Sequence, residues 1–202
     1  MFGEAGLEQI IITAGYFGIF SLMILNGTFS FPSSQILYIV SGYFIFQGDL
    51  TLGLVAFLGA LGNTIGNTVL FYLTREKGLE YITKLTLIPI TEIHKVQIVF
   101  KKHGNWYLFI GKLLPAIKVF MPIVAGVGKM SMKFFVPIVF ISSFIWSLIF
   151  ISIGYYFGKS SDVFGTYAII LLILAAILVF LFYRYMNSTS VLKELKKSKM
   201  DE

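Results

Sequence analysis

Two lysines in an apolar stretch are the residues of this sequence best suited to chemistry. Lys112 and Lys118 lie six positions apart, and the stretch from Gly104 to Gly128 that contains them is otherwise mostly apolar. An ammonium group inside a bilayer costs about 2.5–3.5 kcal/mol on insertion scales, so such a residue is usually shielded, extended toward the surface or functional. Two cations in a partly desolvated cleft attract an anion, and lysine binds phosphate well as a point charge. The alternative is that both side chains reach the headgroups and only anchor the segment.

Uncharged polar residues and prolines form the second group of candidates. Asn26, Gln35 and Asn67 lie at apolar depth, each beside a turn or a glycine. They either contact a ligand or hydrogen-bond between helices, where such a bond is worth about 0.6 kcal/mol, and the second role is the commoner one. Prolines in such segments mark simple kinks or breaks at which backbone groups face a cavity. The candidate site residues are Lys112, Lys118, Pro115, Gly126, Asn26, Ser34, Gln35, Asn67 and Arg75.

Groups that serve catalysis or metal binding are scarce. The chain has no Cys and only 2 His, which excludes disulfides and thiolate sites and argues against a histidine-rich metal cage. No acidic residue lies inside an expected span beside a Ser or His, as intramembrane hydrolysis would require. The sequence therefore predicts neither a cofactor nor an enzymatic activity.

The composition identifies the medium in which the chain folds. Of its 202 residues, 57% are hydrophobic and 13% are charged, against roughly 45–50% and about 25% in soluble domains. A soluble domain of this size has too little interior to bury so many apolar side chains, which include 21 Phe and 11 Tyr. A soluble globular protein is excluded. The formal charge of +6 bears on membrane orientation and is no argument for nucleic acid.

Four uncharged stretches approach or exceed the roughly 20 residues that a membrane helix needs. The first of them contains a turn-like interruption at Phe31-Pro32-Ser33-Ser34. It therefore predicts one full helix followed by a shorter, half-crossing or re-entrant segment. The expected spans are about Leu7 to Asn26, Leu50 to Thr74, Phe134 to Gly158 and Val163 to Tyr183, and the short segment is Gln35 to Phe46.

A second short hairpin is expected in the stretch that contains the two lysines. Pro115 and Pro122 lie with these lysines within eleven residues, which argues against a plain lipid-facing helix. Between the two halves, residues 75–102 mix charged and apolar side chains and predict surface helices at the headgroups. Each half thus combines a proline-interrupted short segment with a longer span, a pattern typical of binding sites in inverted-repeat transporters.

The positive charges predict the orientation. If both short segments return to the side from which they entered, most of the 16 Lys and Arg residues lie on one face, together with both chain ends. The positive-inside tendency makes that face cytoplasmic. No cleavable signal is apparent, since Glu4 and Glu8 replace a basic region. We expect one transmembrane domain over residues 1–188 in the cell membrane, with both termini cytoplasmic and a basic tail, 189–202, that contacts anionic headgroups.

The second hairpin resembles the signature of the DedA family, also called the SNARE-associated or VTT-domain family. The matching run extends from Gly111 to Met130, with Lys112 and Lys118 where the family usually has arginines. The resemblance covers roughly residues 16–158 and is more diffuse upstream. The flanking motifs that carry it are Ser34-Gln35 through Ser41-Gly42-Tyr43, Gly62 to Arg75, Phe134-Phe135, Trp146 and Gly154-Tyr155-Tyr156-Phe157-Gly158.

The resemblance implies a fold and an activity. The fold is an all-α polytopic membrane protein with about four full transmembrane helices, two re-entrant hairpins in a pseudo-inverted repeat, and amphipathic surface helices. The activity is lipid transport of the flippase or scramblase type, with a polyprenyl phosphate or a phospholipid as the phosphate-bearing partner. A non-transporting membrane scaffold and an ion-coupled small-solute exporter stay open as alternatives, and so does the oligomeric state.

Several positions depart from the family pattern. Gln35 replaces a usual glutamate, Asn26 lies near a frequent second one, and Asn67 replaces an aspartate. Amides keep the size and the hydrogen bonds but do not titrate, which brings proton coupling through these positions into question. Lysine in place of arginine keeps the charge but loses the bidentate fork, which alters how phosphate is recognised.

Overall fold

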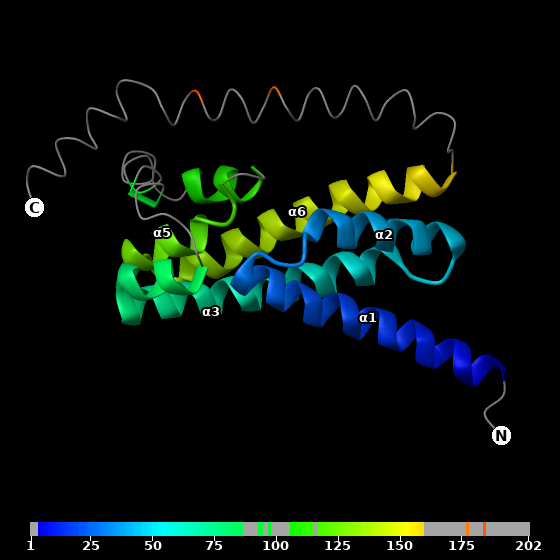
Figure 1. Cartoon of the computed structure of the whole chain (residues 1–202). Coiled ribbons are helices and arrows are strands. Elements are labelled where there is room, and N and C mark those ends of the chain that lie inside the picture. The colour runs from blue at the N-terminus through cyan, green and yellow to red at the C-terminus, as the bar shows by residue number, and fades with distance from the viewer. Residues whose placement is uncertain are drawn as a thin grey trace, which may run out of the picture. The chain divides into compact units, whose positions relative to one another are not determined.

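The structure is all-helical over the part of the chain that it describes (Figure 1). This computed structural model describes residues 4–86, 93–94, 97, 106–114, 117–159, 177 and 184, with side chains from residue 14 onwards and not for 80–86. A helical segment at 106–112 precedes α5, and none of the described residues forms a β-strand. The helices are α1 Glu4–Phe29, α2 Ser34–Gln47, α3 Leu52–Thr86, α5 Met121–Val127 and α6 Met132–Lys159.

Two helices are long and apolar enough to cross a membrane. They are Leu52–Leu79 within α3 and Met132–Lys159, which is α6, each of 28 residues. Their positions confirm the helices predicted to begin near Leu50 and near Phe134. The described apolar part of α1, Ala14–Phe29, is shorter. The predicted full span in α1 stays a prediction, and the predicted fourth span lies almost entirely outside the described residues.

Helix α3 extends beyond the predicted end at Thr74. It reaches Thr86 and is interrupted at Gly78, whose φ of 78° and ψ of −179° are not helical. Glycine adopts this φ without the steric cost that a Cβ would add. The first part of the region expected to form separate surface helices is therefore a continuation of α3 with a break, and most of the rest lies outside the described residues.

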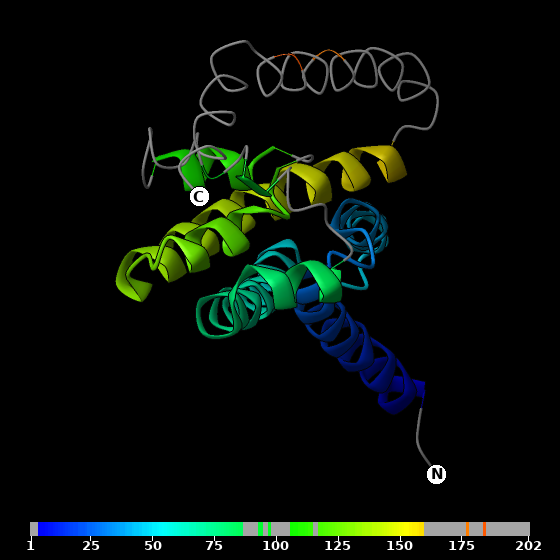
Figure 2. The same ribbon diagram turned by 60° about the vertical axis from the view of Figure 1, so that its left-hand side comes forward.

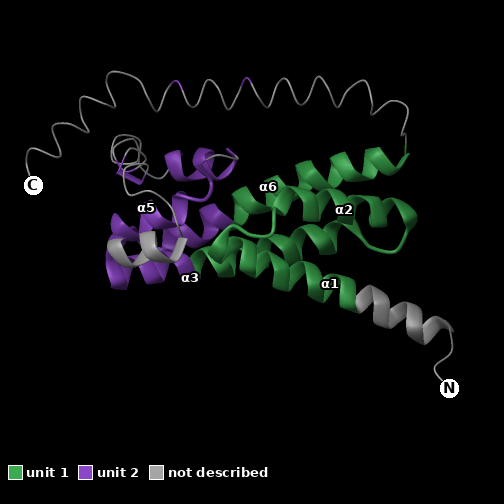
Figure 3. Cartoon of the chain, in the orientation of Figure 1, with its two compact units in different colours: residues 1–68, 140–164 green, residues 69–139, 165–202 purple. Residues whose placement is uncertain are grey.

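The chain divides into two compact units, shown in two colours in Figure 3. Unit 1 comprises residues 1–68 and 140–164, and unit 2 comprises residues 69–139 and 165–202. Each long helix contributes one half to each unit. The first part of α3 and the last part of α6 belong to unit 1, and the remaining halves belong to unit 2.

Unit 1 contains α1, α2, the first part of α3 and the last part of α6, and α1 and α2 form a hairpin (Figures 1 and 2). The Tyr16 hydroxyl accepts a hydrogen bond from the Thr51 backbone N–H at 2.8 Å, at the start of α3. Further along both helices, the Thr28 hydroxyl donates to the Gly66 carbonyl at 3.3 Å. Helix α1 therefore runs in the same direction as α3, and the tip of the hairpin, residues 30–33, begins beside Gly66.

The depth of this tip follows from helix geometry. Gly66 lies fourteen residues after Leu52, which corresponds to about 21 Å at about 1.5 Å per residue. The described limbs of the hairpin therefore reach part of the way along a helix of membrane-spanning length, and α2 returns from the tip. The break predicted at Phe31-Pro32 is the tip itself, between Phe29 and Ser34.

Glycines allow the helices of unit 1 to approach closely. A Cβ added at Gly66 would collide with the Ile24 carbonyl of α1, and one at Gly154 would collide with the Ile39 carbonyl of α2. Gly66 therefore allows α1 to pack directly against α3. Gly53 differs, because nothing lies within 4 Å of the position that its Cβ would take.

Unit 2 has an apolar core between α3, α5 and α6. The rings of Phe71 and Phe135 stack with their centroids 4.4 Å apart. Helix α5 packs on α3 through Gly126, where an added Cβ would lie 2.7 Å from the Phe71 carbonyl oxygen. The buried members of this core are Leu70, Phe71, Ile93, Tyr107, Leu108, Ile117, Met121, Ile123, Val124, Ala125, Met130, Phe135 and Val139.

Candidate functional site

Lys112 is a buried lysine at the end of the helical segment 106–112. Only 5% of its surface is exposed. The segment ends in tight turns, because the Leu113 N–H donates to the Ile110 carbonyl at 2.9 Å and the Leu114 N–H donates to the Gly111 carbonyl at 3.3 Å. Burying an ammonium group is costly unless other groups compensate for the lost hydration. The side-chain amine of Lys112 therefore lies inside unit 2.

Lys118 lies on the loop that follows and is partly buried. Its backbone N–H donates to the Leu114 carbonyl at 3.0 Å, so the loop folds back toward the helical segment. The charges of Lys112 and Lys118 are close enough to repel each other. The structure therefore brings together the two lysines selected from the sequence. Pro115 lies outside the described residues, so its predicted role stays a prediction.

Gly126 and Arg75 also belong to unit 2, and both make structural contacts. Gly126 is buried against the Phe71 carbonyl and the side chain of Thr74. Arg75 is exposed, and its Nη1 donates to the Met130 carbonyl at 3.3 Å. These contacts show how α5 and the turn after it are attached to α3, and a role of either residue in ligand binding stays a prediction.

Three amides form a connected set inside unit 1. The Asn67 Nδ2 donates to the Asn63 Oδ1 at 2.8 Å and to the Asn63 carbonyl at 2.6 Å. The Asn63 Nδ2 donates to the Asn26 Oδ1 at 3.0 Å, and the Asn26 Nδ2 donates to the Pro32 carbonyl at 2.6 Å. Helix α6 joins through Ser143, whose hydroxyl donates to the Asn63 Oδ1 at 2.9 Å. Two of the predicted residues, Asn26 and Asn67, are thus linked through Asn63.

The start of α2 has its own hydrogen bonds. The Ser33 and Ser34 hydroxyls donate to the Gln35 Oε1 at 3.0 and 3.3 Å. The Trp146 Nε1 of α6 donates to the Ser34 hydroxyl at 3.3 Å. Ser33 makes no side-chain capping bond to the backbone of α2. The first backbone N–H groups of a helix need partners from outside the helix.

Sequence reasoning missed Asn63 and Ser143. Asn63 lies four residues before Asn67, a spacing that places both on one face of a helix, so this signal was present in the sequence. Ser143 gave no such signal, since it lies in a long apolar stretch where a serine usually bonds its own helix. Its contact with α3 depends on how the helices pack.

The described residues hold no group of three or more His, Cys, Asp or Glu side chains that could bind a metal ion. The polar groups brought together are two lysines in unit 2 and amides and hydroxyls in unit 1. Lysines bind anions such as phosphate, and amides with hydroxyls form neutral hydrogen-bond networks.

Two helices of membrane-spanning length, together with buried polar side chains in the helical part that the structure describes, fit the class of integral membrane proteins. The family model for the VTT domain matches residues 31–156, more than half of the chain. The chain belongs to this family, and the resemblance to DedA proteins predicted from the second hairpin is confirmed.

Proteins similar in sequence to this chain come from several bacteria. The uncharacterized membrane protein YkoX of Bacillus subtilis (strain 168) is 29% identical over 75% of this chain and 68% of its own. Undecaprenyl phosphate transporter A of the same organism is 25% identical over 79% of this chain and 84% of its own. Protein DedA of Escherichia coli (strain K12) is 24% identical over 63% of this chain and 59% of its own. No solved structure matches the chain.

Proposed function

We propose that the chain moves a phosphate-bearing lipid across the bilayer, as a flippase or scramblase. Lys112 and Lys118 bind the phosphate, while the hydrocarbon chain stays in the membrane. The observation that carries this proposal is the burial of Lys112, which is 5% exposed, beside a second lysine with which it interacts electrostatically. The names of two relatives, both undecaprenyl phosphate transporter A, support a polyprenyl phosphate or a phospholipid as the substrate class.

The electrostatics of unit 2 favour an anion. Two ammonium groups that repel each other are stabilised when an opposite charge lies near both, and the low dielectric of an apolar core strengthens that attraction. A phosphate group offers several strong acceptor oxygens as well as charge. A lysine on each limb of the loop would hold such a headgroup through charge-assisted hydrogen bonds.

The broken helices supply backbone donors that suit the same chemistry. Helix α2 begins at Ser34 after Ser33, which does not cap it with its side chain. The N-terminus of a helix presents backbone N–H groups and the positive end of the helix dipole, both of which favour phosphate. Unit 1 therefore carries a neutral set of donors, and unit 2 carries the charged set.

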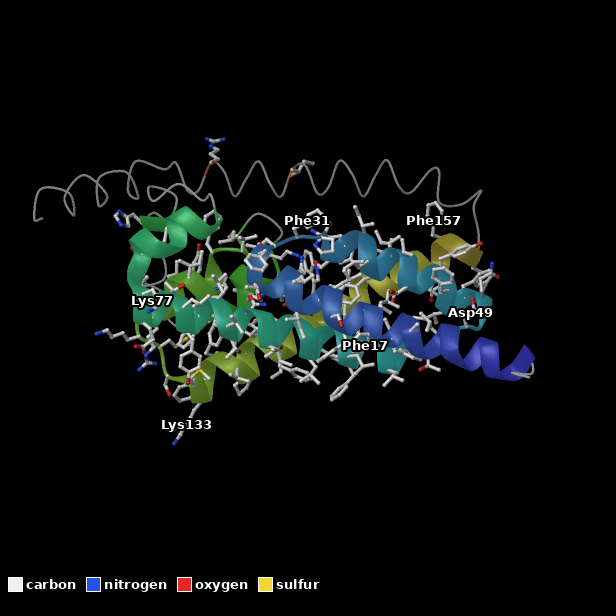
Figure 4. The ribbon with its side chains drawn as sticks, turned by 60° about the horizontal axis from the view of Figure 1, so that its bottom comes forward. Phe17, Phe31, Asp49, Lys77, Lys133 and Phe157 are labelled. Atoms are coloured by element: carbon white, nitrogen blue, oxygen red, sulfur yellow. The ribbon has the colours of Figure 1, made fainter. Side chains whose placement is uncertain are left out.

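The membrane placement proposed with this function follows the charges of the sequence. We propose a multi-pass protein of the cell membrane with one transmembrane domain over residues 1–188, two re-entrant hairpins and cytoplasmic termini. The basic tail at 189–202 would contact anionic headgroups. The exposed lysines proposed to lie on the cytoplasmic side include Lys77 and Lys133. Their side chains point away from the helices of unit 2 in Figure 4.

Reconstituted vesicles test the proposal. Translocation of a labelled polyprenyl phosphate and of a labelled phospholipid is measured for the wild type, for Lys112→Met with Lys118→Met, and for Lys133→Gln. Loss of one charged hydrogen bond costs about 1.5–3 kcal/mol, so we expect the double variant to lose about tenfold or more. Lys133→Gln removes an exposed lysine and should match the wild type.

Each alternative gives a different result in this assay. Undiminished translocation by a folded double variant would overturn the assignment of the lysines. Absence of lipid movement by the wild type would favour the scaffold. Movement of a small solute that requires a pH gradient would favour the exporter. Gel filtration of each variant before reconstitution separates a loss of activity from a loss of fold.

A further inference from the structure

The amides of unit 1 form a relay with a direction. Each amide donates through its NH2 group to the next acceptor, from Asn67 to Asn63, from Asn63 to Asn26, and from Asn26 to the Pro32 carbonyl. Asn26 is 6% exposed, Asn63 7% and Asn67 3%. The last bond, at 2.6 Å, ends on the backbone of the hairpin tip. The relay thus connects α3 to the tip through α1.

We infer that Asn26 is a positioning residue, and that the Asn67–Asn63–Asn26 relay fixes the tip of the α1–α2 hairpin against α3 through the Pro32 carbonyl. The tip begins beside Gly66, about 21 Å along α3 from Leu52. A carbonyl at that depth in a membrane needs a donor, because an unsatisfied polar group in an apolar medium costs several kcal/mol. Asn26 supplies that donor, and Asn63 fixes the orientation of the Asn26 amide by bonding its oxygen.

The relay is neutral, so its geometry does not depend on pH. Within the part of the chain that the structure describes, Asn26 and Asn63 make hydrogen bonds to Asn67 of α3, the Pro32 carbonyl and the Ser143 hydroxyl of α6. None of these carries a charge. On α2 the titratable group packed toward α3 is Tyr38, whose ring lies against Gly59. A phenol ordinarily titrates near pH 10, so Tyr38 stays neutral between pH 5 and 9.

Asn26→Asp converts this neutral link into a pH-dependent one. A protonated carboxyl can still accept from the Asn63 Nδ2 and donate to the Pro32 carbonyl. An ionised carboxylate accepts only, so it would place an oxygen against the Pro32 carbonyl oxygen, with no proton between them. The hairpin tip should therefore be held at low pH and released at high pH. A residue that only filled space at this position would show no such dependence.

The test uses the absence of cysteine from the chain, which allows specific labelling. Spin labels are attached to Phe31→Cys at the tip and to Phe57→Cys on α3, whose native side chains are 76% and 48% exposed and belong to unit 1. Phe31 points outward from the tip in Figure 4. Pulsed EPR in lipid nanodiscs at about pH 5 and about pH 9 brackets the range in which buried carboxyls titrate.

We expect one narrow distance distribution for the labelled parent at both pH values. With Asn26→Asp added, the distribution should match the parent at about pH 5 and broaden reversibly at about pH 9. With Asn26→Leu added, which neither donates nor accepts, it should be broad at both. The matched control is Gln47→Glu, because Gln47 is exposed and its Nε2 donates one hydrogen bond, to the Tyr43 hydroxyl at 2.9 Å. This control should follow the parent throughout.

The inference is overturned if Asn26→Asp follows the parent at both pH values, if Asn26→Leu stays narrow, or if Asn26→Asp fails to fold even at about pH 5, where its hydrogen bonds are kept. The readout is a distance within unit 1. A failure of the proposed transport function would leave this distance result unchanged. A failure of the EPR test would not affect the assignment of the two lysines, which the vesicle assay tests separately.

Discussion

The two units of the chain carry their buried polar groups with opposite chemistry. In unit 1 the tip between α1 and α2 is attached by neutral amides that bond one another and the backbone. In unit 2 the buried Lys112 ends the helical segment 106–112, and Lys118 lies on the loop that follows, where the two charges oppose each other. The difference teaches that the polar groups of unit 1 satisfy one another through hydrogen bonds, whereas the two lysines of unit 2 are the groups that we propose bind a phosphate.

The turn before α3 and the turn before α6 are similar in sequence. Gly48-Asp49-Leu50-Thr51 precedes α3, and Gly128-Lys129-Met130-Ser131 precedes α6. In the first turn Gly48 has a φ of 91° and the Asp49 N–H donates to the Phe44 carbonyl. In the second turn Lys129 has a φ of 49° and the Met130 N–H donates to the Ala125 carbonyl. The left-handed position is a glycine in one turn and a lysine in the other.

The largest expected effect comes from the glycines that bring helices together. Gly66→Val places a side chain against the Ile24 carbonyl, and Gly126→Val places one against the Phe71 carbonyl, so neither can be relieved by a side-chain rotation. We expect each to cost about 3 kcal/mol or more, measured by thermal unfolding in detergent. Gly53→Val is the control because its Cβ meets nothing within 4 Å. Equal losses at Gly53 and Gly66 would contradict the packing described for unit 1.

The next largest effect comes from removing the amide that links α3 to α1 and α6 in unit 1. Asn63→Leu removes the donor to Asn26 and the acceptor for Asn67 and Ser143. Orphaned buried groups cost about 1–3 kcal/mol each, less any relaxation, so we expect a loss of about 2–3 kcal/mol in unfolding free energy.

The matched control for that change is the next residue along α3. Thr64→Val also replaces a buried polar side chain, but the Thr64 hydroxyl bonds only the Ala60 carbonyl of its own helix, at 2.7 Å. We expect a change of less than about 0.5 kcal/mol, because that carbonyl keeps its helical partner. If Thr64→Val cost as much as Asn63→Leu, the link between helices would not be the source of the stability.

A smaller effect comes from exchanging the left-handed residues of the two turns. Gly48→Lys should destabilise by about 1 kcal/mol, because a Cβ is disfavoured at this φ, and no atom lies near enough to add a clash. Lys129→Gly should stabilise by a similar amount, about 1 kcal/mol. Chemical unfolding of both variants checks the signs. Shifts of the same sign would show that something other than backbone conformation governs the two turns.

The sequence predicted the positions of the helices better than the contacts between them. Uncharged stretches located the helices that begin near Leu50 and Phe134, because a lipid medium requires long apolar helices whatever their partners are. The break at Phe31-Pro32 was also visible, since proline and serine interrupt helices. The sequence did not show that α1 and α2 are the two limbs of one hairpin. That pairing depends on tertiary contacts such as the one between Thr28 and Gly66.

The candidate site shows the same division. Lys112 and Lys118 were evident because a cation in an apolar stretch is costly at any position. The relay through Asn63 and the contact from Ser143 were missed, because an amide or a hydroxyl in an apolar helix is equally compatible with a bond to its own helix. Only the packing of α6 beside α3 reveals which of these occurs.

The smallest expected effects concern the bonds that attach the turn before α3 and the turn before α6 to a neighbouring helix. The Tyr16 hydroxyl accepts from the Thr51 N–H at 2.8 Å in unit 1, and the Arg75 guanidinium donates to the Met130 carbonyl at 3.3 Å in unit 2. Tyr16→Phe removes a short bond from the N–H at the start of α3, so we expect a loss of about 1 kcal/mol. Arg75→Gln removes a longer bond from an exposed side chain, and we expect about 0.5 kcal/mol or less. Hydrogen exchange at Thr51 and Met130 localises each effect to its own turn. A larger loss for Arg75→Gln than for Tyr16→Phe would mean that the turn before α6 is attached more firmly than the turn before α3. That result is the reverse of what the two bond lengths indicate.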